Sequence, residues 1–133
     1  RFPLEEQLRR GPITGAARGE MDRQAITKYL DAVWAVVAEA NRYFAAEEPW
    51  KLKSQNPARM QTVLYVTAEV VRQVALLIQP VMPSAAALLL DQLAIPADRR
   101  HFGYLGSEGR LTPDVPLPEP KPVFPRYIEQ PLT

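Results

Sequence analysis

Apolar residues recur every three or four positions over two long stretches of the chain. In residues 22–46 they fall on one face of an α-helix, at Ile26, Leu30, Val33, Val37, Ala40 and Phe44. In residues 57–79 the stripe is wider, with one row at Val63, Thr67, Val70, Val74 and Leu77 and a second at Leu64, Val71, Ala75 and Ile78. A stripe this wide contacts more than one neighbour, so the pattern predicts an all-α, antiparallel helical bundle.

Capping residues and prolines mark where these helices begin and end. Asp22 can cap the first helix, and Pro49 lies beyond its end. Asn56 is followed by a proline, which is typical of an N-cap and the first helical turn. After two further prolines, Ser84 can cap a third, short helix that reaches about residue 93. The bundle is therefore expected to occupy residues 22–95.

The two ends of the chain lack a helical period. Residues 1–21 contain two prolines and three glycines, so we expect mostly a linker from an upstream region, with a brief helix at most around Leu4, Leu8 and Ile13. Residues 96–133 contain eight prolines and predict an extended tail. The tail is too apolar to be freely solvated, so we expect it to pack on the bundle or on a surface that this chain does not contain.

Composition narrows the possible chemistry. The 133 residues include no cysteine, which excludes disulfides and thiolate metal sites. His101 is the single histidine, which excludes metal sites made of several histidines and Ser-His pairs elsewhere in the chain. The acidic pairs Glu5-Glu6 and Glu47-Glu48 have no converging acid or base, so we expect no catalytic residue, no metal site and no cofactor site here. The longest uncharged run, 73–90, is broken by two prolines and is not expected to span a membrane. Because the chain begins with arginine, we expect it to be a piece of a longer protein.

Trp50 is the most informative single residue. It follows a proline in the polar segment 47–55, which we expect to be a loop between two helices. Its ring can fold back into the core, or it can serve as a platform for an unstacked RNA base. The net charge of +1 creates no strong overall field, so any RNA contact must use a local patch. The candidate phosphate contacts are Arg42, Lys51, Lys53 and Arg59.

Two arginines also have structural interpretations. Arg42 can contact a phosphate or form a salt bridge with Glu39 or Glu47. Arg72 lies among apolar residues, so we expect it to pair with Glu69 or Glu39.

Residues 40–52 resemble the anticodon-recognition segment of methionyl-tRNA synthetases. The shared pattern is a helix that ends in Asn-Arg-Tyr, a short acidic turn and then Pro-Trp. Three further patches agree with that family in order and spacing: 62–72, the proline break at 78–83, and the Pro-Val-Phe-Pro-Arg of residues 122–126. The chain is thus similar to the C-terminal, anticodon-binding part of a bacterial methionyl-tRNA synthetase.

This resemblance implies a role in binding RNA. In the family the anticodon is CAU and the tryptophan of Pro-Trp stacks on an anticodon base, a role that falls on Trp50. The other candidate nucleic-acid-binding residues are its neighbours, Asn41, Arg42, Pro49, Lys51 and Lys53. For Asn41 and Pro49, shaping the turn is the competing interpretation. The parent enzyme would join methionine to tRNA with ATP in the cytoplasm, and ATP would bind in a catalytic domain outside this chain, on which the tail could also pack.

Two other interpretations stay open. The chain could be the anticodon-binding domain of a related class I synthetase, specific for valine, leucine, isoleucine or cysteine. It could instead be a helical protein-interaction module with no RNA role, which the low net charge and the apolar tail favour. A self-contained enzyme is disfavoured, because the nucleophiles, bases and metal ligands that it would need are missing.

Overall fold

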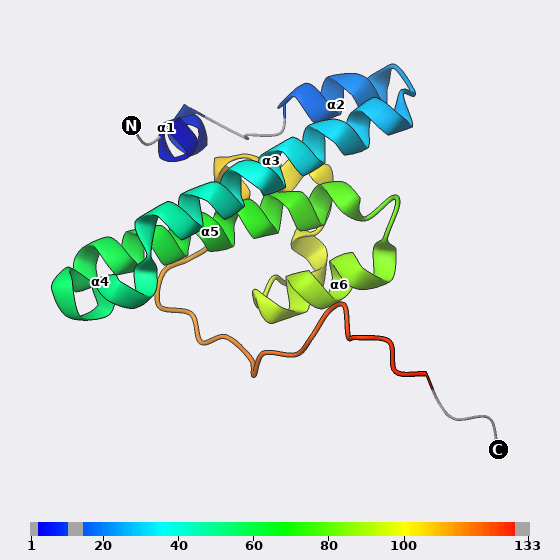
Figure 1. Cartoon of the computed structure of the whole chain (residues 1–133). Coiled ribbons are helices and arrows are strands. Elements are labelled where there is room, and N and C mark those ends of the chain that lie inside the picture. The colour runs from blue at the N-terminus through cyan, green and yellow to red at the C-terminus, as the bar shows by residue number, and fades with distance from the viewer. Residues whose placement is uncertain (1–2, 11–14, 130–133) are drawn as a thin grey trace.

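The computed structural model describes residues 3–10 and 15–129, and their regular structure is all helical, without a strand (Figure 1). Six α-helices and three short 3-10 helices follow one another within these described residues. They are α1 (Pro3–Arg10), α2 (Gly15–Asp22), α3 (Ile26–Glu47), α4 (Pro49–Gln55), α5 (Pro57–Ile78), α6 (Pro83–Gln92), η1 (Ala97–Arg99), η2 (Phe102–Leu105) and η3 (Ser107–Gly109). Residues 110–129 form no regular helix.

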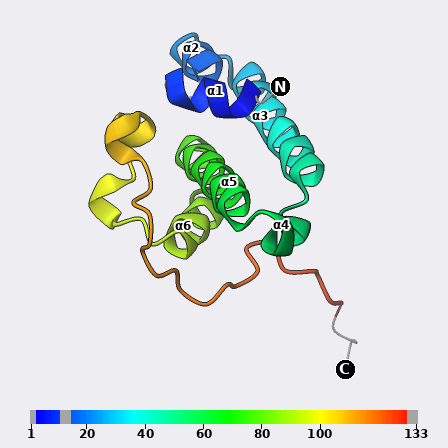
Figure 2. The same ribbon diagram turned by 90° about the vertical axis from the view of Figure 1, so that its left-hand side faces the viewer.

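Helix α5 is the centre of the fold. α3 runs beside it in the opposite direction, and α6 and the 3-10 segment pack on its other sides (Figures 1 and 2). Its C-terminal half is buried around the whole circumference, at Glu69, Val70, Arg72, Gln73, Val74, Ala75, Leu76, Leu77 and Ile78. The Tyr29 hydroxyl donates to the carbonyl of Leu77 and so fixes the start of α3 against the end of α5. The wide apolar stripe of the sequence is explained by these several neighbours.

By length and composition α5 could also cross a membrane. It has 22 residues, and its most apolar window has a mean hydropathy of 1.3. However, 61% of that window is buried inside the protein. The apolar character of α5 is therefore accounted for by packing within the domain.

A buried ion pair on α5 forms hydrogen bonds to residues 104 and 111, in the segment that follows α6. Glu69 and Arg72 are each 1% exposed, and the Arg72 guanidinium donates to the Glu69 carboxylate through Nε at 3.1 Å and through Nη2. Arg72 Nη1 also donates to the Tyr104 carbonyl at 2.5 Å, and the Leu111 amide donates to Glu69 Oε2 at 3.1 Å. The sequence-based prediction of an Arg72–Glu69 pair is confirmed, and the pair also determines where residues 104–111 lie.

The N-terminal segment differs from the sequence-based expectation. Residues 1–21 were expected to be mostly a linker, but their described part contains α1 and α2. Leu4 and Leu8 are buried in the main core, and Arg110 Nη2 donates to the Leu8 carbonyl at 2.6 Å. Ile13, the third residue of the expected brief helix, lies outside the described residues. The brief helix expected at Leu4 and Leu8 is confirmed as α1. Helix α2 was not expected, because Gly15 and Gly19 lie inside it and glycine disfavours a helix interior.

Helix boundaries agree with the prediction in one case and differ in three. The Asn56 side chain caps α5 by accepting from the Arg59 amide at 3.2 Å, as predicted. Asp22 is the last residue of α2 and does not cap α3, whose N-cap is Ala25. The predicted Ser84 cap is also wrong, because α6 already begins at Pro83. The expected loop 47–55 is wrong as well, since it is mostly the short helix α4.

The region expected to be wholly extended from residue 96 begins with the three 3-10 helices and lacks regular structure only from residue 110. Leu105, in η2, is buried in the core, so this part of the chain belongs to the folded domain.

Gly109 provides a test of the packing around the buried ion pair. A Cβ atom at Gly109 would lie 1.9 Å from the Tyr104 carbonyl oxygen and 2.8 Å from Arg72 Nη1, so Gly109→Ala should reduce the free energy of unfolding by about 2 kcal/mol or more. A Cβ at Gly106 would meet nothing within 4 Å, and Gly106→Ala should change it by less than about 0.5 kcal/mol. Urea denaturation of both variants measures the difference, and equal stabilities would contradict this packing.

Val70 tests the core face of α5. The side chain is 1% exposed, so Val70→Asp buries an unpaired carboxylate and should cost about 4 kcal/mol or more, enough to unfold a domain of this size. Leu64 lies on the same helix and is 45% exposed, so Leu64→Asp should be tolerated far better. Thermal unfolding followed by circular dichroism compares the two, and a near-wild-type melting temperature for Val70→Asp would show that the face is wrongly assigned.

Candidate nucleic-acid interface

A single residue, Glu48, forms the turn between α3 and the short helix α4, which carries Trp50. Glu48 adopts a left-handed conformation (φ 46°, ψ 59°), and it is at once the C-cap of α3 and the N-cap of α4. Its amide donates to the Phe44 carbonyl at 3.2 Å, and its carbonyl accepts from the Lys51 amide at 2.8 Å. Pro49 occupies the first position of α4, where proline fits a helix, and it is buried. The turn is therefore defined by backbone bonds on both sides.

Trp50 projects from this turn into solvent. Its side chain is 59% exposed, so it is not a core anchor. The ring packs against Phe44 of α3, with the ring centroids 6.1 Å apart and the planes tilted by 57°. An aromatic ring supported on one side and open on the other is the geometry that stacking on an unpaired base requires.

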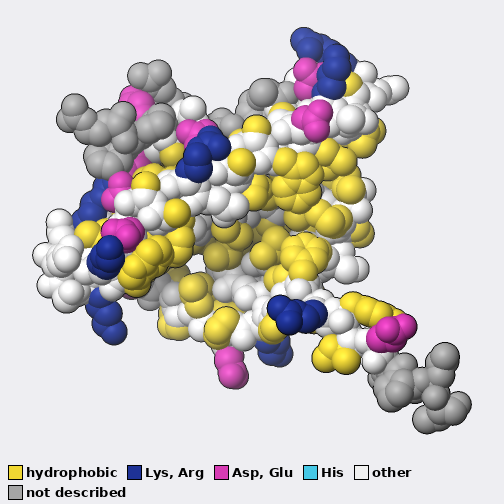
Figure 3. Space-filling model, viewed as in Figure 1, with side chains coloured by type: hydrophobic (Ala, Val, Ile, Leu, Met, Phe, Trp, Pro, Cys, Tyr) yellow, Lys and Arg dark blue, Asp and Glu magenta, His cyan; other side chains and the backbone are white. Residues whose placement is uncertain are grey.

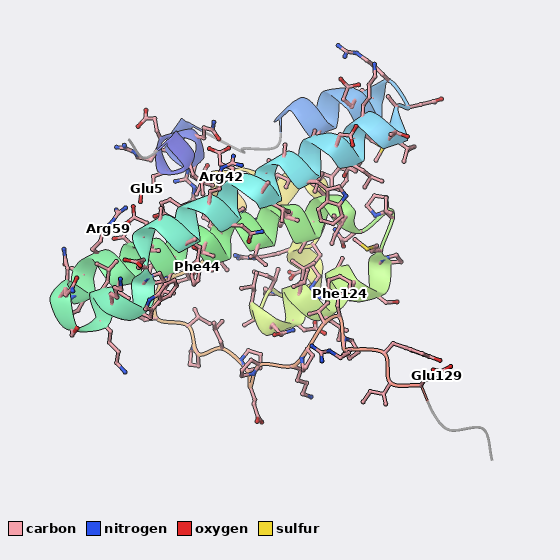
Figure 4. All side chains as sticks on the ribbon, viewed as in Figure 1. Glu5, Arg42, Phe44, Arg59, Phe124 and Glu129 are labelled. Carbon is pink, nitrogen blue, oxygen red and sulfur yellow. The ribbon has the colours of Figure 1, made fainter. Side chains whose placement is uncertain are left out.

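The basic residues around the turn differ in their surroundings. Lys51 pairs with Glu48 at 2.9 Å within the same turn. Lys53 and Arg42 are exposed, and within the described residues neither forms an ion pair. Figure 4 places Arg42 on the side of α3 that faces α1, whereas Phe44, the ring partner of Trp50, lies on the opposite side. Lys51 and Lys53 lie on the same helix as Trp50, α4, whereas Arg42 lies on a different surface of the domain.

Asn41 lies beside an apolar groove. The groove has a cavity volume of about 340 Å³ and opens on the face between α3 and α6, where hydrophobic side chains gather (Figure 3). Its lining includes Trp34, Asn41, Phe44, Val71 and Phe124 of the C-terminal region. Among the described residues the Asn41 side chain makes no hydrogen bond to the backbone of the turn, so the interpretation that Asn41 shapes the turn gains no support from such a bond.

Arg59 belongs to an ion network behind the turn. Its Nη2 atom lies 2.9 Å from both Glu5 Oε1 and Glu47 Oε1, and its Nε donates to Glu47 Oε2 at 3.1 Å. The bond to Glu47 raises the pKa of the guanidinium, although burial opposes that rise. The Tyr43 hydroxyl donates to Glu5, and its pKa is raised by burial and then by this bond. Arg59 was a candidate phosphate contact, but its charge is directed to two carboxylates inside the domain.

Sequence reasoning did not identify Phe44 as the support for Trp50, nor Glu5 as part of the network. Phe44 could have been found, because it lies six positions before Trp50 on the apolar face of α3. No sequence signal points to Glu5, since its partner Tyr43 is 38 residues away. No group of acidic or histidine side chains that could hold a metal ion exists within residues 3–10 and 15–129.

Residues 5–106 match the family described as the anticodon binding domain of methionyl tRNA ligase. The chain belongs to this family. Its match covers the Trp50 turn, the ion network and the buried pair on α5, so these features lie inside the anticodon-binding domain.

Curated relatives agree with this assignment. The chain is 60% identical over 116 residues to the methionine–tRNA ligase of Rhizobium meliloti, an alignment covering 87% of this chain and 22% of that protein. It is 47% identical over 114 residues to the methionine–tRNA ligase of Mycobacterium tuberculosis, covering 83% of this chain and 22% of that protein. The chain thus spans about a fifth of the length of these relatives.

Solved structures match the fold as well. The apo methionyl-tRNA synthetase of Mycobacterium tuberculosis superposes with a TM-score of 0.84 at 42% identity, over 96% of this chain and 26% of that one. The same synthetase bound by methionyl-adenylate gives a TM-score of 0.83 at 42% identity, over 92% of this chain and 25% of that one. The helical arrangement described above is therefore that of the family.

The exposure of Trp50 generates a prediction about stability. Because more than half of the side chain is in solvent, Trp50→Ala should lower the free energy of unfolding by less than about 1.5 kcal/mol. Tyr29 is fully buried, and Tyr29→Ala should cost about 3–5 kcal/mol. Guanidinium denaturation separates the two, and equal losses would mean that the Trp50 ring is a core residue.

Proposed function

We propose that this domain binds the anticodon loop of a methionine-accepting tRNA with the anticodon CAU, and that Trp50 stacks on one of its bases. The observation that supports the proposal most directly is the half-exposed Trp50 ring, held against Phe44 on a defined turn in a member of an anticodon-binding family. Stacking on a protein aromatic contributes about 1–3 kcal/mol per base and suits single-stranded loops.

Electrostatic contacts have a smaller part in this proposal. Lys51 and Lys53 lie on α4 beside Trp50 and are the first candidates for phosphate contacts, whereas Arg42 would reach only RNA that extends around α3 toward α1. Asn41 would contribute from the rim of the groove, and Pro49, which is buried, would set the direction of the turn. With so few exposed cations nearby, binding should weaken with salt only moderately.

The longer protein is proposed to be a methionine–tRNA ligase of the cytoplasm. It would join methionine to tRNA at the expense of ATP, and ATP and methionine would bind in a catalytic domain outside this chain. Under this proposal the chain binds tRNA and supplies no catalytic residue. The similarity to relatives of which it spans about a fifth supports this arrangement.

The C-terminal region is proposed to lie as a strap on the antiparallel bundle. Phe124 lines the apolar groove that opens between α3 and α6 over α5, while the neighbouring Tyr127 and Ile128 are largely exposed and available to a catalytic domain. This same groove supports the second candidate function, a protein-interaction surface without an RNA role. A related class I synthetase specificity is not favoured, because residues 5–106 match the methionyl family.

Aminoacylation by the full-length enzyme that contains this domain tests the proposal. Trp50→Ala should reduce kcat/KM for a tRNA with a CAU anticodon by about tenfold or more, because a stacking contact is lost. Trp34→Ala is the matched control. Trp34 lies on α3 and, like Trp50, is about half exposed (48%), so its loss should change kcat/KM little.

Two results would contradict the proposal. Equal effects of Trp50→Ala and Trp34→Ala would remove the special role of Trp50. A wild-type enzyme that charges a tRNA with a different anticodon as efficiently as one with CAU would contradict the proposed anticodon specificity.

A further inference from the structure

Three helices meet behind the turn that carries Trp50. Glu5 comes from α1, Tyr43 and Glu47 from the end of α3, and Arg59 from the first turn of α5. Figure 4 shows Glu5 and Arg59 close together beside that end of α3. The guanidinium lies between the two carboxylates, at 2.9 Å from each, and the tyrosine hydroxyl donates to the carboxylate of Glu5.

The network is well shielded from water. The exposed fractions of the Arg59, Glu5 and Glu47 side chains are 22%, 17% and 16%. Ion pairs at such sites are screened less by salt than those on the surface, and their hydrogen bonds fix the geometry of all partners together. By contrast, the pairs Glu20–Arg23 and Glu48–Lys51 join residues one helical turn apart and have a partner that is more than half exposed.

The position of the network along the chain connects it to Trp50. Glu47 is the last residue of α3 and directly precedes the left-handed Glu48. Arg59 lies just past α4, and its own amide is bound by the Asn56 cap. The Arg59–Glu47 contact therefore joins the two ends of the segment that contains α4 and Trp50. Glu5 adds a support from α1, which is far away in sequence.

We propose that Glu5 and Arg59 are positioning residues for anticodon binding, which hold the end of α3, α4 and the start of α5 in the arrangement that presents the Trp50 ring to RNA. This inference rests on the proposed function. Neither residue needs to touch RNA, because the network acts through the direction of the turn. A turn held in the binding conformation loses less conformational entropy when RNA binds.

Glu5→Gln provides the decisive change, because charge and positioning predict opposite results. Removing a carboxylate makes the domain more positive, which by itself should tighten RNA binding and lower the KM for tRNA. Loss of positioning should instead raise that KM, and we expect a rise of about three- to tenfold with kcat changed little. The measurement is steady-state aminoacylation by the full-length enzyme with varied tRNA.

Two further variants complete the design. Glu20→Gln makes the same chemical change in a pair on α2 far from the turn, and it should leave KM unchanged. Tyr43→Phe removes only the hydroxyl that donates to Glu5, without any change of charge, and should raise KM by a smaller factor. It keeps the inference testable if Glu5→Gln fails to fold, which circular dichroism would reveal.

A double mutant shows whether the effect passes through Trp50. If Glu5 acts by orienting the ring, Glu5→Gln should have little further effect on KM in a Trp50→Ala enzyme. A full additional effect in that background would overturn the inference, as would a fall in KM for the single variant.

The KM values of these variants distinguish a failure of the positioning role from a failure of the proposed function. If Trp50→Ala raises KM while Glu5→Gln and Tyr43→Phe behave like Glu20→Gln, the RNA-binding role stands and the positioning role is wrong. If Trp50→Ala itself has no effect on tRNA use, the proposed function is wrong, and the positioning role is wrong with it.

Discussion

The buried pair of Glu69 and Arg72 is the constraint on which the rest of the fold depends. Each residue is 1% exposed, and an unpaired charge at such a depth would cost several kcal/mol. Their mutual contact leaves bonding capacity that the Tyr104 carbonyl and the Leu111 amide satisfy. Residues 104–111 therefore have only one favourable place along α5. The close approach of Gly109 to the Tyr104 carbonyl follows from that placement.

A helix enclosed in this way serves as a rigid support for its own N-terminal end. The second half of α5 is covered by α3, α6 and the 3-10 segment, while its first turn carries Arg59 and receives the end of α3. The Trp50 turn lies at this exposed end. Burial and exposure are thus divided along one helix, with the core at one end and the candidate interface at the other.

Sequence alone predicted the parts of the molecule that follow local rules. The two long helices followed from apolar periodicity, the Asn56 cap from its proline, and the Arg72–Glu69 pair from a charge among apolar neighbours. Helix α1 agrees with the brief helix expected around Leu4 and Leu8, whereas α2 was missed because it contains Gly15 and Gly19. In the site, Trp50 was singled out from the sequence, but the segment that carries it is α4 and not the expected loop, and Arg59 was assigned to phosphate contact. Its partner Glu5 is brought to it only by the tertiary fold.

The use of cations inside the domain indicates how such a domain can bind RNA at a net charge of +1. Arg59 and Arg72 pair with buried or partly buried carboxylates, Arg100 pairs with Asp91, and Lys51 pairs with Glu48 at the turn itself. Charges committed in this way give little general attraction for a phosphate backbone. Under the proposed function, affinity would then come mainly from base stacking on Trp50, and stacking depends on the orientation of the ring. In the proposed positioning role, one of these internal pairs, Arg59–Glu47, also orients that ring, so the same contact would lower the free positive charge and define the turn.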